Sequence, residues 1–360
     1  MKAIHAYIMM LSMALLLTAC DVHEFPEHEE PGPLAVDVPL EIDFVDGEMK
    51  EYRTINTFKP TRGLMEMNHD LRITIEVTDD SETLTRSDAP ILRETYTLNG
   101  YGERNHSTSI RLSPGNYRIL AICDYVAAGT TSSLYYDLED FFNINLLSVG
   151  DKADGYVHSG TNKYREIFRG EARVRVGDDG KVYNPDDDGV AYEIKVPMHR
   201  PIAKFQFVSD DFQEFVTKVV KERSEHKEPG TRVYPPEQSD YSVRFRYTGY
   251  MPSTYNAYID KPVDSRTGVA FISPLSSLQD GRTQMGFDYV FVNGVETSVN
   301  IVVDVMDAKT GNNIATSDVV EVPLKRNKVT VVTGKFFTTS ASGGLGVDAS
   351  FYDEYDIEIK

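Results

Sequence analysis

The sequence has no tryptophan, only two cysteines among its 360 residues, and no apolar run of the roughly 20 residues that a membrane-spanning helix needs. Two cysteines exclude a framework of several disulfides. Cys123 follows a run of apolar residues, so we interpret it as a small buried side chain, with a reactive thiol as the alternative. The absence of indole rings argues against a sugar-binding platform, unless some of the 21 tyrosines take their place.

Positive charge is also scarce. The chain has 37 lysines and arginines against 56 aspartates and glutamates, which gives a formal net charge of −19. Removal of residues 1–19 would take away one lysine and leave −20. Such a surface repels phosphate backbones and anionic lipid, so we expect no nucleic acid among the partners.

Motifs that carry chemistry are missing. The sequence contains no G-x-S-x-G elbow, no P-loop and no G-x-G-x-x-G, and its histidines are scattered singly. We therefore expect a protein that is not an enzyme and that has no catalytic residue, no cofactor and no metal site.

One stretch begins like a calcium-binding loop. Asn184, Asp186, Asp188 and Gly189 are spaced as such a loop requires, but its twelfth position is Lys195, where a bidentate glutamate is needed. We interpret the stretch as a solvated acidic turn, with weak calcium binding as the alternative.

The N-terminus has the pattern of a signal peptide. Lys2 precedes an apolar run over about residues 6–17, and Leu17-Thr18-Ala19-Cys20 follows. These four residues resemble the lipobox of bacterial lipoproteins, which implies cleavage after Ala19 and acylation, including palmitate, of Cys20. The alternative is an ordinary secretion signal. Several acyl chains would anchor the protein firmly to a membrane.

The next residues, 20–33, are rich in acid and proline and cannot build a core, so we expect an extended tether. Acidic residues directly after the lipidated cysteine resemble the surface-export signal of Bacteroides lipoproteins. The resemblance implies a surface-exposed lipoprotein anchored in the outer membrane.

Alternation of apolar and polar residues dominates the remaining chain and predicts strands. We expect strands at 34–44, 70–77, 92–98, 107–112, 116–126, 164–176, 190–197, 200–208, 241–248, 254–259, 268–273, 286–293, 296–305, 314–322 and 328–338. Asn293-Gly294 and the glycine of 178–180 favour tight hairpins.

Helix is rare in this pattern. The spacing of Phe212, Phe215, Val216 and Val219 predicts one helix over 209–223, capped by Ser209 or Asp210. A second short helix is predicted over 135–147. Many short strands with turns between them are typical of β-sandwiches, and prolines at 197 and 201 favour a boundary near 198–201. We expect an N-terminal domain over 34–199 and a C-terminal domain over 200–360.

Three stretches, 112–126, 200–211 and 322–338, together with the lipobox, resemble the fimbrillin-type lipoprotein family of the Bacteroidota, which forms the stalk, anchor and tip of type V pili. The resemblance implies an all-β fold of two tandem transthyretin-like β-sandwich domains with one or two short helices. It also implies a structural or adhesive role in fimbriae, as a pilus anchor or accessory subunit.

The C-terminal residues, 345–360, follow a Gly/Ser-rich connector and alternate throughout. One face would present Val347, Ala349, Phe351, Tyr355, Ile357 and Ile359. By the resemblance this strand is a candidate donor to a neighbouring fimbrial subunit through β-strand addition. The alternative is that it completes its own domain.

Arg62 lies in an apparent loop. Stalk subunits of the family are cut after a basic residue, so Arg62 is a candidate processing site, with an ordinary loop arginine as the alternative. The rival function is a glycan- or nutrient-binding surface lipoprotein, which would need an exposed tyrosine platform, such as Tyr135 with Tyr136 or Tyr247 with Tyr250.

Overall fold

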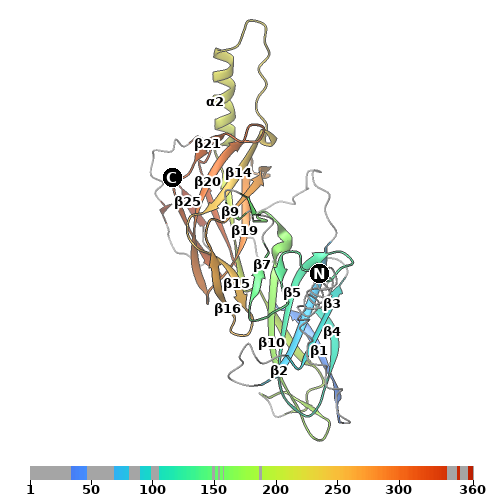
Figure 1. Cartoon of the computed structure of the whole chain (residues 1–360). Coiled ribbons are helices and arrows are strands. Elements are labelled where there is room, and N and C mark those ends of the chain that lie inside the picture. Colours follow the sequence, from blue (N-terminus) through green and yellow to red (C-terminus); the bar gives the residue numbers. More distant parts are fainter. Residues whose placement is uncertain are drawn as a thin grey trace, which may run out of the picture.

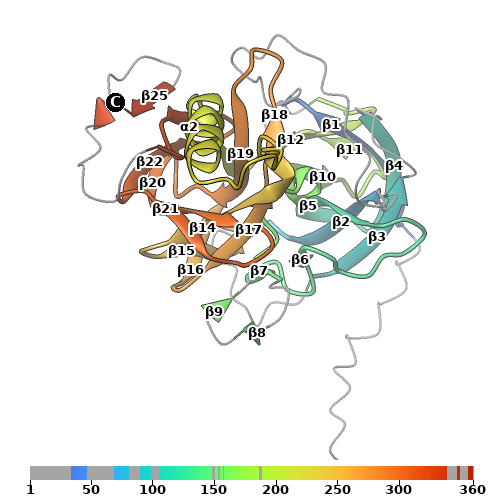
Figure 2. The same cartoon turned by 90° about the horizontal axis from the view of Figure 1, so that it is seen from above.

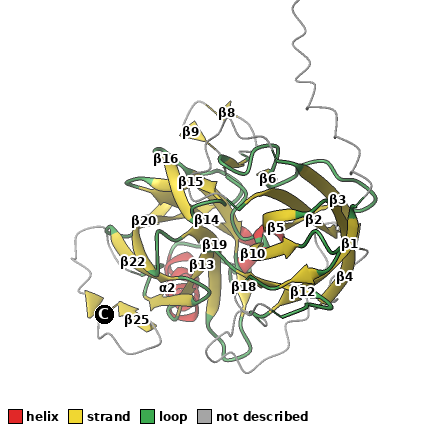
Figure 3. Cartoon of the chain, turned by 90° about the horizontal axis from the view of Figure 1, so that it is seen from below, coloured by secondary structure: helices red, strands yellow, loops and turns green. Residues whose placement is uncertain are grey.

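The computed structural model describes residues 34–46, 69–80, 90–98, 105–147, 158–185 and 189–338, and the backbone alone of 151–152, 155–156, 347–348 and 356–359. Strands and the loops that join them make up nearly all of this chain (Figure 3). The all-β fold class is therefore confirmed.

An eight-stranded sheet, here the N-terminal sheet, holds the first part of the chain. Its strand order is β3-β2-β5-β10-β12-β1-β4, and β11 pairs with β10. All pairs are antiparallel except β1 with β12, which is parallel. The strands are β1 (Val36–Phe44), β2 (His69–Asp79), β3 (Leu92–Leu98), β4 (Asn105–Leu112), β5 (Gly115–Ala127), β10 (Ile167–Val176), β11 (Val182–Tyr183) and β12 (Ile194–His199).

The N-terminal sheet bends back on itself around one core (Figure 2). β10 and β12 share only the pairs Arg169 with His199 and Gly170 with Met198. At the two ends of the strand order, the rings of Tyr96 on β3 and His106 on β4 lie 5.4 Å apart. The inward residues of β1 and β2 are fully buried between the two layers: Val38, Leu40, Ile42, Ile73, Ile75 and Val77.

Two sheets form the second part, here the C-terminal sandwich. One has the order β18-β19-β13-β23-β25-β24, and the other the order β17-β14-β20-β21 with β22 beside β20. Their strands are β13 (Ile202–Ser209), β14 (Tyr241–Tyr247), β17 (Ala270–Pro274), β18 (Ser276–Ser277), β19 (Thr283–Phe291), β20 (Glu296–Asp307), β21 (Asn313–Thr316), β22 (Val320–Lys325), β23 (Val329–Gly334), β24 (Val347–Asp348) and β25 (Asp356–Ile359).

Aromatic rings join these two sheets. Phe207 on β13 meets Phe245 on β14, in the other sheet, with ring centroids 5.4 Å apart. Phe245 in turn stacks at 4.8 Å on Phe271 of β17, its neighbour in the same sheet. Edge-to-face and offset pairs of this kind add to the free energy gained by burial of apolar area. The same alternation of side chains that predicted the strands therefore places the rings between the sheets.

A smaller four-stranded sheet connects the two parts of the chain, in the order β16-β15-β7-β6. β7 (Ile144–Leu146) lies beside β15 (Met251–Asn256), flanked by β6 (Tyr136–Asp137) and β16 (Lys261–Arg266). The helix predicted over 135–147 is therefore wrong, because pairing with β15 extends this segment. The short strands β8 (Asp151–Lys152) and β9 (Gly155–Tyr156) pair only with each other.

The one α-helix of the described residues is α2 (Phe212–Glu225), which extends beyond the ends of the strands (Figure 1). Two 3-10 turns, η1 (Lys163–Arg165) and η2 (Gln238–Asp240), are the other helical elements there. The prediction of a helix near 209–223 is confirmed, but its N-cap is Asp211 rather than Ser209 or Asp210.

The two hairpin predictions have different outcomes. Gly180 has a φ of 73° and closes the hairpin of β10 and β11, as expected. The hairpin at Asn293-Gly294 is wrong, because β19 and β20 belong to different sheets and only Gly294 has a positive φ. This connection crosses from one sheet of the sandwich to the other. The domain limits at 34–199 and 200–360 stay a prediction.

Candidate functional site

Residues 158–162, here the strap, come from the first part of the chain and run along the C-terminal sandwich. The N–H of His158 donates to the carbonyl of Ala270 on β17 at 2.9 Å. The N–H of Thr161 donates to the carbonyl of Phe287 on β19 at 2.7 Å, and the Thr161 hydroxyl donates to Ser273 at 2.9 Å. Backbone groups at the edges of both sheets of the sandwich are thereby paired by one strap.

The strap requires an unusual backbone. A Cβ atom at Gly160 would lie 2.1 Å from Cδ2 of Phe271, so only glycine fits against this ring. Thr161 has a φ of 54°, in the left-handed region that a β-branched residue rarely adopts. The bond from its hydroxyl to Ser273 and its backbone bond to Phe287 hold it there.

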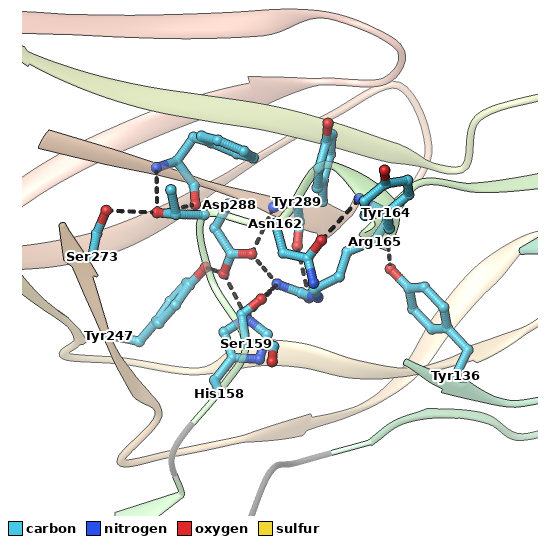
Figure 4. A network of polar contacts seen from close by, with 12 residues as sticks. Tyr136, His158, Ser159, Asn162, Tyr164, Arg165, Tyr247, Ser273, Asp288 and Tyr289 are labelled. Carbon is cyan, nitrogen blue, oxygen red and sulfur yellow. Dashed lines mark hydrogen bonds and ion pairs between the residues drawn. The ribbon is translucent and has the colours of Figure 1, made fainter. Parts of the chain in front are cut away.

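A buried ionic network lies under the strap (Figure 4). Asp288, fully buried on β19, forms an ion pair with Arg165 of η1. Its Oδ2 lies 2.6 Å from Nε2 of His158 and accepts a hydrogen bond of 2.7 Å from the Tyr247 hydroxyl. The carbonyl of Arg165 in turn accepts a bond of 2.7 Å from the Tyr136 hydroxyl of β6.

The network sets the charges of its members. Burial raises the pKa of Asp288, but Arg165 and His158 outweigh it and hold that pKa below its ordinary value. Burial and the adjacent Arg165 lower the pKa of His158, so the imidazole is neutral near pH 7. Burial raises the pKa of Tyr247 well above its ordinary value. The result is one buried aspartate–arginine pair with neutral hydrogen-bond partners.

A cavity of about 340 Å³ lies where β12 leads into β13, lined by residues of both parts of the chain. Its lining contains three arginines and three carboxylates, and each guanidinium is paired with an acid. Arg169 pairs with Glu171, and Arg326 donates to Asp260 at 2.6 Å. The Arg200 guanidinium donates to Glu166 at 3.2 Å, and its backbone N–H donates to Asp46 at 2.8 Å. Because these charges are satisfied internally, the lining points to no particular ligand.

The start of the C-terminal tail is fixed by Asp211, which is buried. Its carboxylate accepts hydrogen bonds from the N–H groups of Phe336, Phe337 and Thr338 at 3.1, 3.0 and 2.7 Å. The rings of Phe337 and Phe215 pack 5.3 Å apart beside it. The chain beyond Thr338 therefore leaves from a defined point at the base of α2.

Cys20 and Arg62 lie outside the described residues, as do Ala349, Phe351 and Tyr355 of the tail and Asp186 and Asp188 of the acidic turn. The backbone of β25 lies parallel to β23, with Asp356 opposite Val331 and Ile357 opposite Val332. β24, which contains Val347, pairs antiparallel with β25, where Ile359 lies opposite Val347.

The tyrosine platform is not formed by the expected residues. Tyr135, Tyr136 and Tyr247 are 8%, 1% and 4% exposed, and only Tyr250 is exposed, at 74%. Tyr136 and Tyr247 belong to the ionic network instead. Cys123 is fully buried, which confirms its interpretation as a core side chain.

Sequence reasoning missed the strap and the network. His158 was one of several scattered histidines, and Arg165 stood at the start of a predicted strand. One signal was present: Asp288 interrupts the apolar stretch 285–292, and a charge in such a strand needs a buried partner. Among the described residues, no group of three or more metal-ligating side chains comes together. No helix in that part of the chain is long and apolar enough to cross a membrane.

The chain is similar in structure to several solved proteins. The fimbrial anchor protein Mfa2 of Porphyromonas gingivalis is 11% identical, with a TM-score of 0.37 over 78% of this chain and 82% of that one. The tip fimbrial protein Mfa3 of the same species is 10% identical, with a TM-score of 0.32 over 80% and 81%. A candidate adhesin of Bacteroides ovatus is 10% identical, with a TM-score of 0.41 over 91% and 96%.

No curated protein matches the sequence. A family model does match, over residues 34–360, which is most of the chain. The protein therefore belongs to the family of unknown function DUF6562.

Proposed function

We propose that the protein is a lipoprotein of the outer cell surface and a structural or adhesive component of fimbriae, as a pilus anchor or accessory subunit. The observation that carries this proposal is Cys20, which follows an apolar run and two small residues and precedes an acidic, proline-rich tether. An acyl anchor and a tether hold a folded body away from the membrane. The solved proteins named above, a fimbrial anchor, a fimbrial tip protein and a candidate adhesin, agree with this role.

The fold supports a structural role. The buried charges of the network around Asp288 pair with one another. The strap and the pairing of β7 with β15 join the first part of the chain to the C-terminal sandwich. A body held together in this way is suited to bind its neighbours through its surface.

The anchor is tested by a Cys20→Ser variant. We expect it to lose palmitate labelling and to leave the membrane fraction, whereas a Cys123→Ala variant keeps both properties. A Cys20→Ser protein that still labels with palmitate and sediments with the envelope would overturn the proposal.

We further propose that residues 345–360 are donated to a neighbouring subunit. In the chain alone, β25 covers the outer edge of β23, an edge whose backbone groups pair with any added strand. A chain that lacks 345–360 should stay folded and stop joining fimbriae. Unfolding of the truncated chain would instead assign the strand to its own sheet.

Processing at Arg62 decides between stalk and anchor. Mass spectrometry of the protein from fimbriated cells would detect a species that starts at residue 63 if the chain is cut. We expect only the uncut, acylated chain, because the proposed role is that of an anchor or accessory subunit. A dominant 63–360 species would assign the stalk role.

A further inference from the structure

Residues 217–235, here the arm, project from the end of the C-terminal sandwich. They comprise most of α2 and the chain that returns beside it, beyond the ends of the strands (Figure 1). Within 221–235 every residue is exposed except Val233, which is half-buried. The last turn or so of a helix, without a buried face, contributes little to the stability of the chain that carries it.

The base of the arm is held firmly. Phe212 packs its ring 5.1 Å from Phe337, and Phe215 lies 5.3 Å from Tyr241. The arm therefore projects from the rigid base formed by these rings.

The charge of the arm is opposite to that of the rest of the chain. It holds five lysines and arginines against three glutamates, a net charge of +2, in a protein of −19. Residues 34–199 hold 29 acidic and 18 basic side chains, a net charge of −11. The arm and the N-terminal sheet lie at opposite ends of the molecule (Figure 1).

The basic groups of the arm are available for contact. Lys218, Lys221 and Lys227 are exposed, and none pairs with an acid in the described part of the chain. Near the far end, the Tyr234 ring is 65% exposed, and the Arg232 guanidinium lies 5.3 Å from its centre. Tyrosine and arginine together are typical of protein contact surfaces.

We propose that the arm binds the acidic N-terminal part, residues 34–199, of a second copy of this chain. Two different surfaces at opposite ends make a head-to-tail contact, which repeats along a row of molecules. Opposite net charges favour the encounter and set the orientation. The proposal does not depend on the lipid anchor or on donation of the tail.

The test is photo-cross-linking of the purified full chain with benzoylphenylalanine in place of Tyr234. We expect a product of twice the mass in which residue 234 is joined to a peptide from 34–199 of the other copy. The triple variant Lys218→Glu, Lys221→Glu, Lys227→Glu should lower the yield about tenfold, and salt at about 0.5 M should lower it similarly.

The matched control is Lys261→Glu, Lys325→Glu, Lys328→Glu, which changes the net charge equally at the end of the sandwich opposite the arm. We expect its yield to stay within about twofold of the parent chain. Circular dichroism melting of each variant separates loss of contact from loss of fold. Absence of the doubled product, a partner peptide from 200–360 alone, or equal loss in both triple variants would overturn the proposal. Retention of the parent arm on a heparin column without any doubled product would also overturn it, because the partner would then be an anionic glycan.

Discussion

The carboxylate of Asp211 accepts both the N–H and the hydroxyl of Thr338, at 2.7 and 2.8 Å, across 127 positions of the sequence. The same carboxylate accepts the N–H groups of the two preceding residues. It thereby closes the sandwich beside α2 and sets the point at which the tail begins.

Asp211→Ala should lower the free energy of unfolding by about 3 kcal/mol or more, because several buried donors lose their acceptor at once. Denaturant unfolding at pH 7 measures the change. Asp210→Ala, at the exposed neighbour, is the control and should stay within about 0.5 kcal/mol. Equal effects of the two substitutions would show that the carboxylate does not hold the tail.

The buried imidazole of His158 should make the protein sensitive to mild acid. Its pKa in the folded chain lies below the ordinary value of 6.5 because of burial and Arg165, with Asp288 acting in the opposite direction. Below pH 6.5 the unfolded chain therefore binds a proton that the folded chain does not, so stability present above pH 6.5 is lost as the pH falls. The slope should be at most about 1.4 kcal/mol per pH unit.

Denaturant unfolding of a His158→Gln variant, measured between about pH 7 and pH 5, should show a shallower loss of stability than the parent chain. His226→Gln, at an exposed site beyond α2, should leave the parent slope unchanged. Parallel slopes for the parent and for His158→Gln would contradict a neutral imidazole in the network.

Gly160→Ala should destabilise the strap. The added methyl group would lie 2.1 Å from the Phe271 ring, and overpacking of this kind costs about 1–3 kcal/mol. Gly249→Ala is the matched control, since its Cβ would meet nothing nearer than Asn300 at 4.0 Å. Thermal unfolding of both variants provides the comparison. Equal stability of Gly160→Ala and the control would mean that the strap shifts away from the Phe271 ring without loss of free energy of unfolding.

Cys123 should be unreactive in the folded protein. The side chain is fully buried, and burial, with Asp124 beside it, raises the pKa of the thiol well above 9.0. In a Cys20→Ser background it is the sole thiol, so a chromogenic disulfide reagent at pH 7 should react only after denaturant is added. Reaction within minutes in buffer would show that β5 opens locally.

Much of the strand content could be predicted, because it depends on local alternation. The strand expected at 92–98 is β3, at Leu92–Leu98. β5 is longer than expected by one residue at each end, and β14 starts as expected and ends one residue earlier. Elements that depend on partners far away in the sequence are harder to predict. Residues 135–147 have apolar side chains at helical spacing, yet Ile144 pairs with Tyr255 more than 100 residues away.

The strap and the ionic network could not be predicted for the same reason. Nothing near His158 in the sequence indicates that it meets Asp288, since 130 positions separate them. Asn293-Gly294 has the composition of a hairpin, but the core of the sandwich requires β19 and β20 to lie in opposite sheets. Local composition defines a turn, and packing decides which strands the turn joins.

The two parts of the chain are attached at three separate places: the link from β12 to β13, the strap on β17 and β19, and the pairing of β7 with β15. A single covalent link would act as a hinge about which one body swings freely. The further attachments remove that freedom, so a force applied at one end would be passed on as tension along the long axis rather than lost in bending. The glycine that lets the strap lie flat against Phe271 thus contributes to the mechanical stiffness of the whole molecule.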